Sequence, residues 1–288
     1  MKLRGARVWV TGASSGIGAA LVPPLTARGA RVAVSARRGD LLETLAAGWR
    51  SAGADVLVAP LDVTDRDAVI AAVRRIEAAW GGIDLAILNA GTHQAPAGPG
   101  FEAAQFVDVM TLNYFGVLYG IEAVLPGMLA RGRGHIAGTA SLAGYRAVPT
   151  AAAYGASKAA LIHALESLRF DIEPRGVRVT VINPGFVRTP LTDRNRFRMP
   201  FLMDVERAAA IIVSGIERDR KEIHFPRVFS TLLKVARVLP FPVYERLIRR
   251  ATAGQRRARG SLAGPPPHAG PSSEGDKLQV SRGGEANR

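Results

Sequence analysis

The sequence predicts an α/β fold in which a doubly wound parallel sheet of about seven strands carries helices on both faces. Short apolar runs rich in β-branched residues alternate with longer segments of helical periodicity, a pattern typical of parallel strands joined by helical crossovers. The first apolar run leads directly into a glycine-rich turn. Polar residues follow several later runs, and ligands of such sheets bind beyond the carboxyl ends of the strands.

The individual elements follow from the same patterns. The clearest helical periodicity falls in 65–80, 101–131 and 154–173, and Asp65 is a residue type that starts helices. Pro23 and Pro24 lie inside the helix expected after the first turn, so we expect that helix to kink or to start late. The expected strands cover residues 6–11, 31–35, 55–59, 84–89, 134–140, 177–183 and 222–226.

The turn after the first strand, Thr11-Gly-Ala-Ser-Ser-Gly-Ile-Gly18, has the features of a nucleotide-binding turn. Gly12, Gly16 and Gly18 let the backbone turn tightly and approach a pyrophosphate. The anion would then lie against the unpaired amides and the positive dipole end of the following helix. The order of strand, turn and helix is the context that such a motif requires.

A second motif combines Tyr154 and Lys158 with Ser141 upstream. Residues four apart lie on one face of a helix, so the ammonium of Lys158 is expected to lie near the phenol of Tyr154 and lower its pKa toward neutrality. Ser141 would add a hydroxyl to the same carbonyl oxygen. Alone, a tyrosine and a lysine at this spacing occur in many helices where they only pack, so the pair needs the nucleotide-binding turn as support.

Together these motifs resemble the short-chain dehydrogenase/reductase family, over roughly residues 5–226. The resemblance implies a Rossmann-like fold with a catalytic tetrad of Asn113, Ser141, Tyr154 and Lys158 and no required metal. Leu88 departs from the pattern, since the family often has an asparagine there. The implied cofactor-binding residues are Gly12, Ser14, Ser15, Gly16, Ile17, Gly18, Arg37, Arg38, Asp62, Val63, Asn89, Ala90, Gly91, Tyr154, Lys158, Pro184, Gly185, Val187 and Thr189.

The activity implied by the resemblance is reversible hydride transfer between a nicotinamide and a carbonyl carbon, with the reductase direction favoured. Tyr154 would give the carbonyl oxygen its proton, and Ser141 would hydrogen-bond that oxygen as negative charge develops. Lys158 would hold the nicotinamide ribose and tune Tyr154, while Asn113 would support a water relay. His93, His135 and His163 are interpreted as incidental, structural or surface residues.

The end of the second strand indicates the cofactor. Ala36 stands where the family's NAD-specific acid would usually be, and Arg37 and Arg38 follow it. An acid would bind the ribose hydroxyls of NAD, whereas arginine pairs with a 2′-phosphate through its planar fork of donors. We therefore expect NADP(H), although the two arginines could also be an ordinary solvated turn.

The substrate is less defined than the cofactor. In the family the segment after the sixth strand, here 186–203, caps the substrate pocket, and its second half mixes apolar side chains with Arg194, Arg196 and Arg198. Such a cap suits an apolar substrate. Its arginines could meet a carboxylate, a phosphopantetheine or an acidic carrier protein, or could simply be solvated.

Composition restricts the compartment and the class of partner. The 288 residues include no cysteine, which excludes disulfides and fits a reducing compartment. The first strand begins within a few residues of Met1, and no apolar run has the ~18 residues of a membrane span, so a cytoplasmic protein is expected. A small-molecule substrate and a homodimer or homotetramer are expected as partners, with no nucleic acid.

Beyond the catalytic segment, expected at 1–226, the chain becomes strongly basic. Residues 227–260 hold nine Lys or Arg and one acid, a net charge of +8 within the +14 of the whole chain. Apolar residues at helical spacing predict a basic amphipathic appendage over 227–253, whereas 254–288 has the composition of a disordered tail. The stretch 227–250 could contact the inner membrane face, cover the active site or pack against a second subunit.

Three other functions fit the sequence less well than a reductase does. A catalytically silent NADP-binding sensor on the same fold is disfavoured because the whole tetrad is present. A nucleic-acid binder would fit the sequence pI of about 11.1, but no nucleic-acid motif accompanies that charge. A sugar-nucleotide epimerase would need a different glycine spacing and a longer substrate domain.

Overall fold

The computed structural model describes residues 1–93, 101–193 and 199–260. Contacts divide the chain into two compact units, Met1–Ile248 and Arg249–Arg288. The first unit holds every strand of the sheet and every catalytic residue expected from the sequence.

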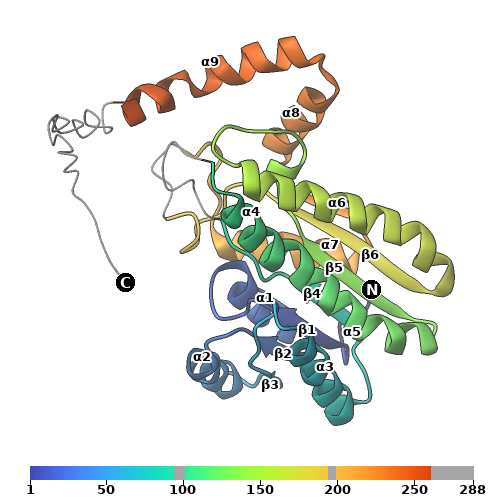
Figure 1. The fold of residues 1–288 in the computed structure, drawn as a ribbon. Helices are drawn as coiled ribbons and strands as arrows, with labels where there is room; N and C mark the ends of the chain where they lie inside the picture. The colour runs from blue at the N-terminus through green and yellow to red at the C-terminus, as the bar shows by residue number, and fades with distance from the viewer. Residues whose placement is uncertain (94–100, 194–198, 261–288) are drawn as a thin grey trace, which may run out of the picture. The chain divides into compact units, whose positions relative to one another are not determined.

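A parallel sheet forms the centre of the first unit (Figure 1). Its strand order β3-β2-β1-β4-β5-β6-β7 reverses direction at β1, so successive crossovers place helices on both faces. The predicted doubly wound α/β fold is therefore confirmed, and its seven strands fall where the apolar runs predicted them. They are β1 (Arg7–Thr11), β2 (Arg31–Ser35), β3 (Val56–Val58), β4 (Leu85–Leu88), β5 (Gly134–Thr139), β6 (Val177–Pro184) and β7 (Glu222–Phe225).

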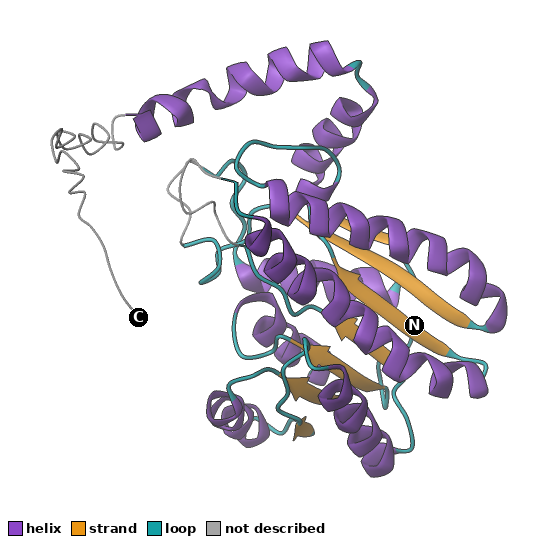
Figure 2. Ribbon diagram, viewed as in Figure 1, coloured by secondary structure: helices purple, strands orange, loops and turns teal. Residues whose placement is uncertain are grey.

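The helices form two layers around the sheet, as the secondary-structure colouring shows (Figure 2). Alternate side chains of one strand enter different cores: Val8 and Val10 of β1 pack with one layer, and Trp9 packs with the other. The first layer contains α1 (Gly16–Thr26), α2 (Gly39–Ser51) and α7 (Val205–Glu217), and the second contains α3 (Arg66–Trp80), α5 (Gly116–Ala130) and α6 (Ala152–Ile172).

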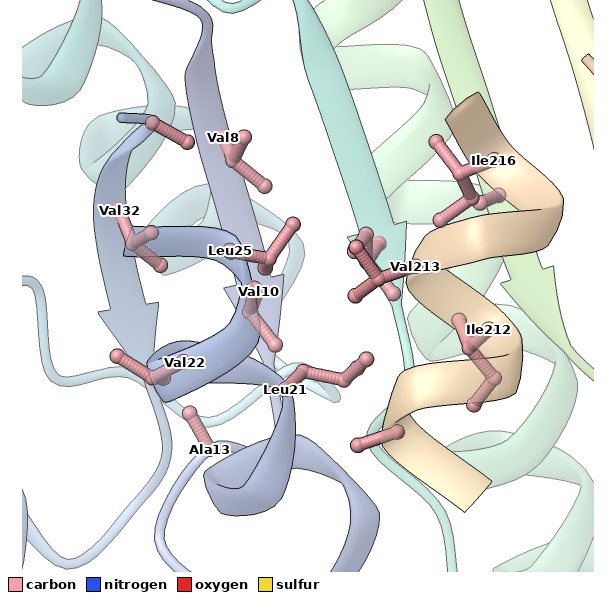
Figure 3. Packing of buried hydrophobic residues seen from close by; sticks show 14 of the residues in the cluster. Val8, Val10, Ala13, Leu21, Val22, Leu25, Val32, Ile212, Val213 and Ile216 are labelled. Carbon is pink, nitrogen blue, oxygen red and sulfur yellow. The ribbon is translucent and has the colours of Figure 1, made fainter. Parts of the chain in front are cut away.

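The core beneath the nucleotide-binding turn joins α1 to α7 on one face of the sheet. Figure 3 shows Leu21 and Leu25 of α1 facing the same space as Ile212 and Val213 of α7, and all four side chains are fully buried. Burial of such side chains contributes about 1.5–3 kcal/mol each. This packing fixes the start of α1, and with it the turn that precedes the helix.

Helix α1 begins at Gly16, so it does not start late as one alternative predicted. Pro23 and Pro24 both lie in its last turn, which ends at Thr26, so only the two hydrogen bonds that their amides would have donated four residues back are lost. The prolines therefore leave the first turns of the helix, which face the glycine-rich turn, with their regular hydrogen bonds.

The long helix predicted over 101–131 is interrupted. Its first part, α4 (Ala103–Met110), passes through a π-helical turn, Thr111–Phe115, before α5 begins. Among the described residues, the run Ala103–Ala130 is the one helix that could cross a membrane by length and composition, and 39 % of its most apolar window is buried inside the protein. Core helices pass the same test.

The basic appendage begins with two helices, α8 (Arg227–Val238) and α9 (Phe241–Gly260). Helix α8 follows β7 and packs against that strand. Helix α9 extends into the segment 254–288 for which disorder was predicted, and residues 261–288 of that segment lie outside the described residues. The boundary between units, after Ile248, assigns α8 and the start of α9 to the compact first unit.

Candidate active site

A cavity of about 910 Å³ opens at the carboxyl ends of the strands, where the sheet reverses its winding. All of the expected cofactor-binding residues except Gly18 line it. Gly18 is buried beneath the turn. Of the expected tetrad, Tyr154 and Lys158 line the cavity, whereas Asn113 and Ser141 are buried behind its wall.

Two glycines of this turn, Gly12 on the cavity wall and Gly18 buried beneath it, stand where no side chain fits. Gly12 has a φ of +69°, and a Cβ on it would lie 2.8 Å from the Cα of Ala90. A Cβ on Gly18 would lie 2.2 Å from the carbonyl oxygen of Gly12. Both contacts are closer than atoms tolerate, so the backbone cradle requires glycine, as a site for a pyrophosphate at the start of α1 does.

The residues just after β4 donate hydrogen bonds to Thr11, at the start of this turn. The backbone amides of Asn89 and Ala90 both donate to the hydroxyl of Thr11, at 2.9 and 3.1 Å. The side chain of Asn89 donates to the Thr11 carbonyl at 3.3 Å. These bonds hold the ends of β1 and β4 together, so the turn and the segment Asn89–Gly91 form one wall.

Tyr154 and Lys158 lie one turn apart near the start of α6, as the spacing predicted. The ammonium nitrogen of Lys158 lies 5.8 Å from the centroid of the Tyr154 ring. It donates to the carbonyl oxygen of Thr139 at 2.8 Å and is buried. A Cβ on Gly91 would lie 3.3 Å from the same nitrogen, so Lys158 projects to the cavity wall formed by the end of β4.

Asn113 sits in the π-helical turn between α4 and α5. Its side-chain oxygen accepts from the amide of Thr92 at 2.7 Å, and its nitrogen donates to the Thr92 carbonyl at 2.9 Å and to the Ser157 hydroxyl at 3.0 Å. A π turn widens the helix locally and is frequent at functional sites. Here it brings the asparagine of the second helix layer against the loop after β4.

Ser141 follows β5 with extended backbone and caps the short helical turn Leu142–Gly144. Its hydroxyl oxygen accepts from the amide of Ala143 at 3.1 Å. The Tyr154 phenol is within hydrogen-bond reach of Ser141. The residues of the tetrad thus come from three places in the chain, and the sheet brings them to one edge.

Burial dominates the proton affinities in this site. It raises the pKa of the Tyr154 phenol, and the hydrogen bond with Ser141 opposes that rise only in part. Burial also lowers the pKa of Lys158 to about 8. The expected lowering of the Tyr154 pKa by Lys158 is not seen, because burial is the largest influence and raises that pKa, while the ammonium donates to Thr139.

His93 is a site residue that the sequence interpretation left out. Its ring meets the ring of Tyr154 edge-on, with centroids 4.9 Å apart, and burial lowers its pKa. The signal available in the sequence was its position just after Asn89-Ala-Gly91. His135, in contrast, is a buried structural residue bonded to Thr180 at 2.8 Å, and His163 is exposed, as interpreted from the sequence.

Two arginines form the end of the cavity below β2. Ala36, Arg37 and Arg38 line it together, so no acid occupies the first position after the strand. The Arg38 guanidinium donates to the hydroxyl of Ser14 at 3.0 Å, and the Arg37 guanidinium lies 3.9 Å from Asp62. Arg38 therefore contacts the glycine-rich turn, whereas Arg37 lies near the loop after β3.

The segment expected to cap the pocket closes on itself at its base. Val187 and Met203 form a parallel bridge, and the amide of Met203 donates to the Phe186 carbonyl at 3.0 Å. Thr189 and Thr192 hydrogen-bond to one another within the loop. Arg194, Arg196 and Arg198 of the expected cap lie outside the described residues.

Helix α8 contacts this cap through aromatic side chains. The ring of Phe229 stacks with Phe186, at a centroid distance of 6.1 Å, and with Phe201, at 5.8 Å. These contacts join the first helix of the basic appendage to the loop over the cavity.

Helix α8 is also bonded to the loop between Ser141 and Tyr154. Glu222 of β7 accepts hydrogen bonds from the Tyr145 phenol, from Asn183 at 3.0 Å and from Lys234 of α8 at 2.5 Å. Arg146 donates to three carbonyls at the end of α8, that of Leu239 at 2.8 Å among them, and its guanidinium lies 4.1 Å from the centroid of the Tyr244 ring. Neither anchor was predicted from the sequence.

Known proteins are similar to this chain in sequence and in fold. A family model for short chain dehydrogenases matches residues 6–199. An uncharacterized oxidoreductase of Myxococcus xanthus is 41 % identical over 84 % of this chain and 95 % of that protein. Gluconate 5-dehydrogenase of Gluconobacter oxydans is 35 % identical over 67 % of this chain and 75 % of its own length.

Among solved structures, a short chain dehydrogenase/reductase from Burkholderia phymatum in complex with NAD matches with a TM-score of 0.73 and 25 % identity, over 80 % of this chain and 92 % of that one. Proteins of this family bind a nicotinamide cofactor, and the glycine cradle described above fits such a group. The protein is a dehydrogenase/reductase, and its chain belongs to the short-chain dehydrogenase/reductase family.

Proposed function

We propose that this enzyme interconverts a carbonyl and an alcohol on an apolar substrate, with NADP(H) as cofactor and Tyr154 as proton donor and acceptor. The observation that carries the proposal is the placement of Tyr154 and Lys158 on the wall of a cavity that is also lined by two arginines, with Ala36 in place of an acid just after β2. When bound, the nicotinamide supplies or accepts the hydride.

Tyr154 performs the proton transfer in this proposal. In the reductive direction its phenol gives a proton to the carbonyl oxygen of the substrate as the hydride reaches the carbon, and it takes the proton back in the oxidative direction. Burial raises its pKa, so the phenol is protonated at neutral pH and ready to donate. Ser141 hydrogen-bonds the same oxygen and stabilises the charge that develops there.

Lys158 and Asn113 support the tyrosine. The Lys158 ammonium faces the cavity between Gly91 and Thr139, where it binds ribose hydroxyls, and its charge favours the phenolate that forms after donation. Asn113 holds the backbone of Thr92 by paired hydrogen bonds, and its side-chain nitrogen also donates to the hydroxyl of Ser157 on α6, so the three residues form a chain of hydrogen bonds. We infer that this chain positions a proton path from the site to solvent.

The preference for NADP(H) rests on Arg37 and Arg38. A 2′-phosphate next to β2 would find two guanidinium groups within the cavity and no competing carboxylate at Ala36. The exposed Arg37–Asp62 pair contributes little in water and is easily exchanged for a phosphate. Phosphate therefore gains charge-assisted hydrogen bonds that NAD lacks.

Affinity measurements test this preference directly. The dissociation constants of NADPH and NADH are measured for the wild type, Arg37→Ala and Arg38→Ala, with Arg31→Ala, at the opposite end of β2, as a control. Loss of a charge-assisted bond at about 1.5–3 kcal/mol predicts a 10- to 150-fold weaker NADPH complex and an unchanged NADH complex. Equal affinities of the wild type for both cofactors would remove the basis of the proposal.

An apolar substrate is inferred from the cap and from α8. Phe186, Phe201 and Phe229 form a stacked group at the base of the cap, and Met203 is buried beneath it. Ketones and aldehydes that include steroid, retinoid and 3-oxoacyl compounds, assayed with NADPH against small polar ketones, test this inference. A wild-type enzyme that binds NADPH but reduces none of them would instead support a cofactor sensor.

We also propose a homodimer or homotetramer in the cytoplasm. Val107 of α4, Phe115 beside α5 and Phe170 of α6 are exposed apolar residues, on helices that pack next to each other. Contact between copies would bury them. Light scattering of the wild type and of Phe170→Glu tests the assembly, and cell fractionation tests the location.

A further inference from the structure

Helix α8 is fixed in one orientation with an apolar side directed outward. Its inner side carries Ser230, which is fully buried, and Lys234, which is bonded to Glu222. Arg146 binds the carbonyls at its carboxyl end. These contacts on the inner side hold the helix in this rotation, so its outer side stays exposed to solvent.

The outer side of α8 is a continuous apolar stripe. The residues recur at spacings of four, three and three, which keeps them on one side of a helix. Each of these residues is between 57 and 81 % exposed. A single exposed valine or leucine is ordinary on a protein surface, but a contiguous row of them marks an interaction site. The stripe consists of Val228, Leu232, Val235 and Val238.

The start of α9 continues this surface. Phe241 and Leu247 are 64 and 50 % exposed. Exposed basic residues border the apolar side chains in the same stretch, Arg227, Arg237 and Arg246 among them. The following residues, 249–260, add five arginines and no acid. Over residues 227–248 the surface thus combines exposed apolar side chains with exposed arginines.

We propose that the outer face of α8 and the start of α9 docks on an anionic lipid membrane. Apolar side chains on one side of a helix enter the boundary between headgroups and acyl chains, and neighbouring arginines attract anionic headgroups. A second copy of the chain is a poorer occupant, because a symmetric contact would place the same positive charge against itself. An uncharged apolar partner would leave the arginines unused.

Docking at this face would bring lipid close to the cap of the cavity. Phe229 lies on the inner side of the docked helix and stacks with Phe186 and Phe201 of the cap. An apolar substrate dissolved in the membrane would then be concentrated beside the entrance. The docking itself is independent of the proposed function, and the test below measures binding without turnover.

The test is sedimentation of the full chain with phosphatidylcholine vesicles that contain phosphatidylglycerol, against vesicles of phosphatidylcholine alone. Leu232→Glu/Val235→Glu is expected to lose binding at least about 100-fold, because two apolar side chains no longer insert. Ala47→Glu/Ala71→Glu, at exposed positions of α2 and α3, adds the same charge away from α8 and is expected to bind normally.

A second pair of variants tests the charge. Arg237→Gln/Arg246→Gln is expected to weaken binding about 30-fold, since each arginine near an anionic surface contributes about 1 kcal/mol. Arg74→Gln/Arg218→Gln makes the same change in net charge at exposed positions elsewhere and serves as its control. Binding of the wild type should fall as salt rises. The NADPH affinity of each variant reports whether it is folded.

Three results would overturn the proposal. The first is no sedimentation of the wild type with anionic vesicles at low salt. The second is binding that survives Leu232→Glu/Val235→Glu, which would assign it to the arginine-rich stretch after Ile248 alone. The third is an oligomer without vesicle binding that dissociates on the same double substitution, which would make the face a contact between copies of the chain.

Discussion

Replacement of Glu222 by alanine should destabilise the enzyme by about 3–4 kcal/mol. The Glu222 carboxylate accepts hydrogen bonds from Tyr145 and Asn183, which are both buried, and from Lys234. A bond from a buried neutral donor to a charged acceptor contributes about 1.5 kcal/mol at the low end, so loss of two costs about 3 kcal/mol. Lys234 is 39 % exposed, and its ion pair adds no more than about 1 kcal/mol.

Thermal unfolding measures this effect. For a chain of this size, 1 kcal/mol corresponds to about 2–4 °C in Tm, so Glu222→Ala should lower Tm by about 6–16 °C. Glu43→Ala removes a carboxylate from an exposed ion pair with Arg50 and should lower it by less than about 2 °C. If the two variants unfold within about 2 °C of each other, the assignment of Glu222 as the anchor is incorrect.

The pH dependence gives a second measure of the same anchor. Burial alone would raise the pKa of the Glu222 carboxyl, but hydrogen bonds from Lys234, Tyr145 and Asn183 outweigh it and hold the pKa below its ordinary value. A lowered pKa means that the stabilisation is fully present above the unfolded-state value and disappears as the pH falls through the folded-state value. The Tm difference between wild type and Glu222→Ala should therefore shrink in acid.

Further predictions concern the site and the appendage. Tyr154→Phe should bind NADPH within about twofold of the wild type and lose turnover at least about 100-fold, measured by fluorescence titration and steady-state kinetics; retained turnover would reassign the proton donor. The affinity for NADPH should fall as the pH rises past about 8, where Lys158 loses its charge, and Lys158→Met should show a flat profile. Deletion of 261–288 should leave Tm and NADPH affinity unchanged, whereas a chain ending at residue 226 should aggregate, because Phe229 and Leu233 no longer cover the core.

The sequence predicted the parts of the site that depend on local spacing. Tyr154 and Lys158 are one turn apart on one helix, and Gly12, Gly16 and Gly18 belong to one turn, so the periodicity of a single element defines each group. The strands were also predictable, because a fully buried parallel strand is a continuous apolar run, as in β1 and β4.

The parts that were missed depend on contacts between distant residues. Tyr145 and Glu222 are 77 residues apart, and Arg146 meets carbonyls more than 90 residues further along the chain. The π turn at Asn113 has the same apolar periodicity as the helices on either side, so the pattern predicted one uninterrupted helix. The spacing also predicted that Lys158 lies near Tyr154, but it could not show that the ammonium donates a hydrogen bond to the carbonyl of Thr139, which is distant in the sequence.

The appendage is part of the architecture of the site because of where it is anchored. Tyr145 and Arg146 lie between Ser141 and Tyr154 in the chain, and both are held by α8 or by its neighbour β7. The loop between Ser141 and Tyr154 is therefore held by β7 through Tyr145 and by α8 through Arg146. The same helix also contacts the cap, because the ring of Phe229 stacks with Phe186 and Phe201. A displacement of α8 would therefore move the loop that precedes Tyr154, the proposed proton donor, together with the cap of the cavity.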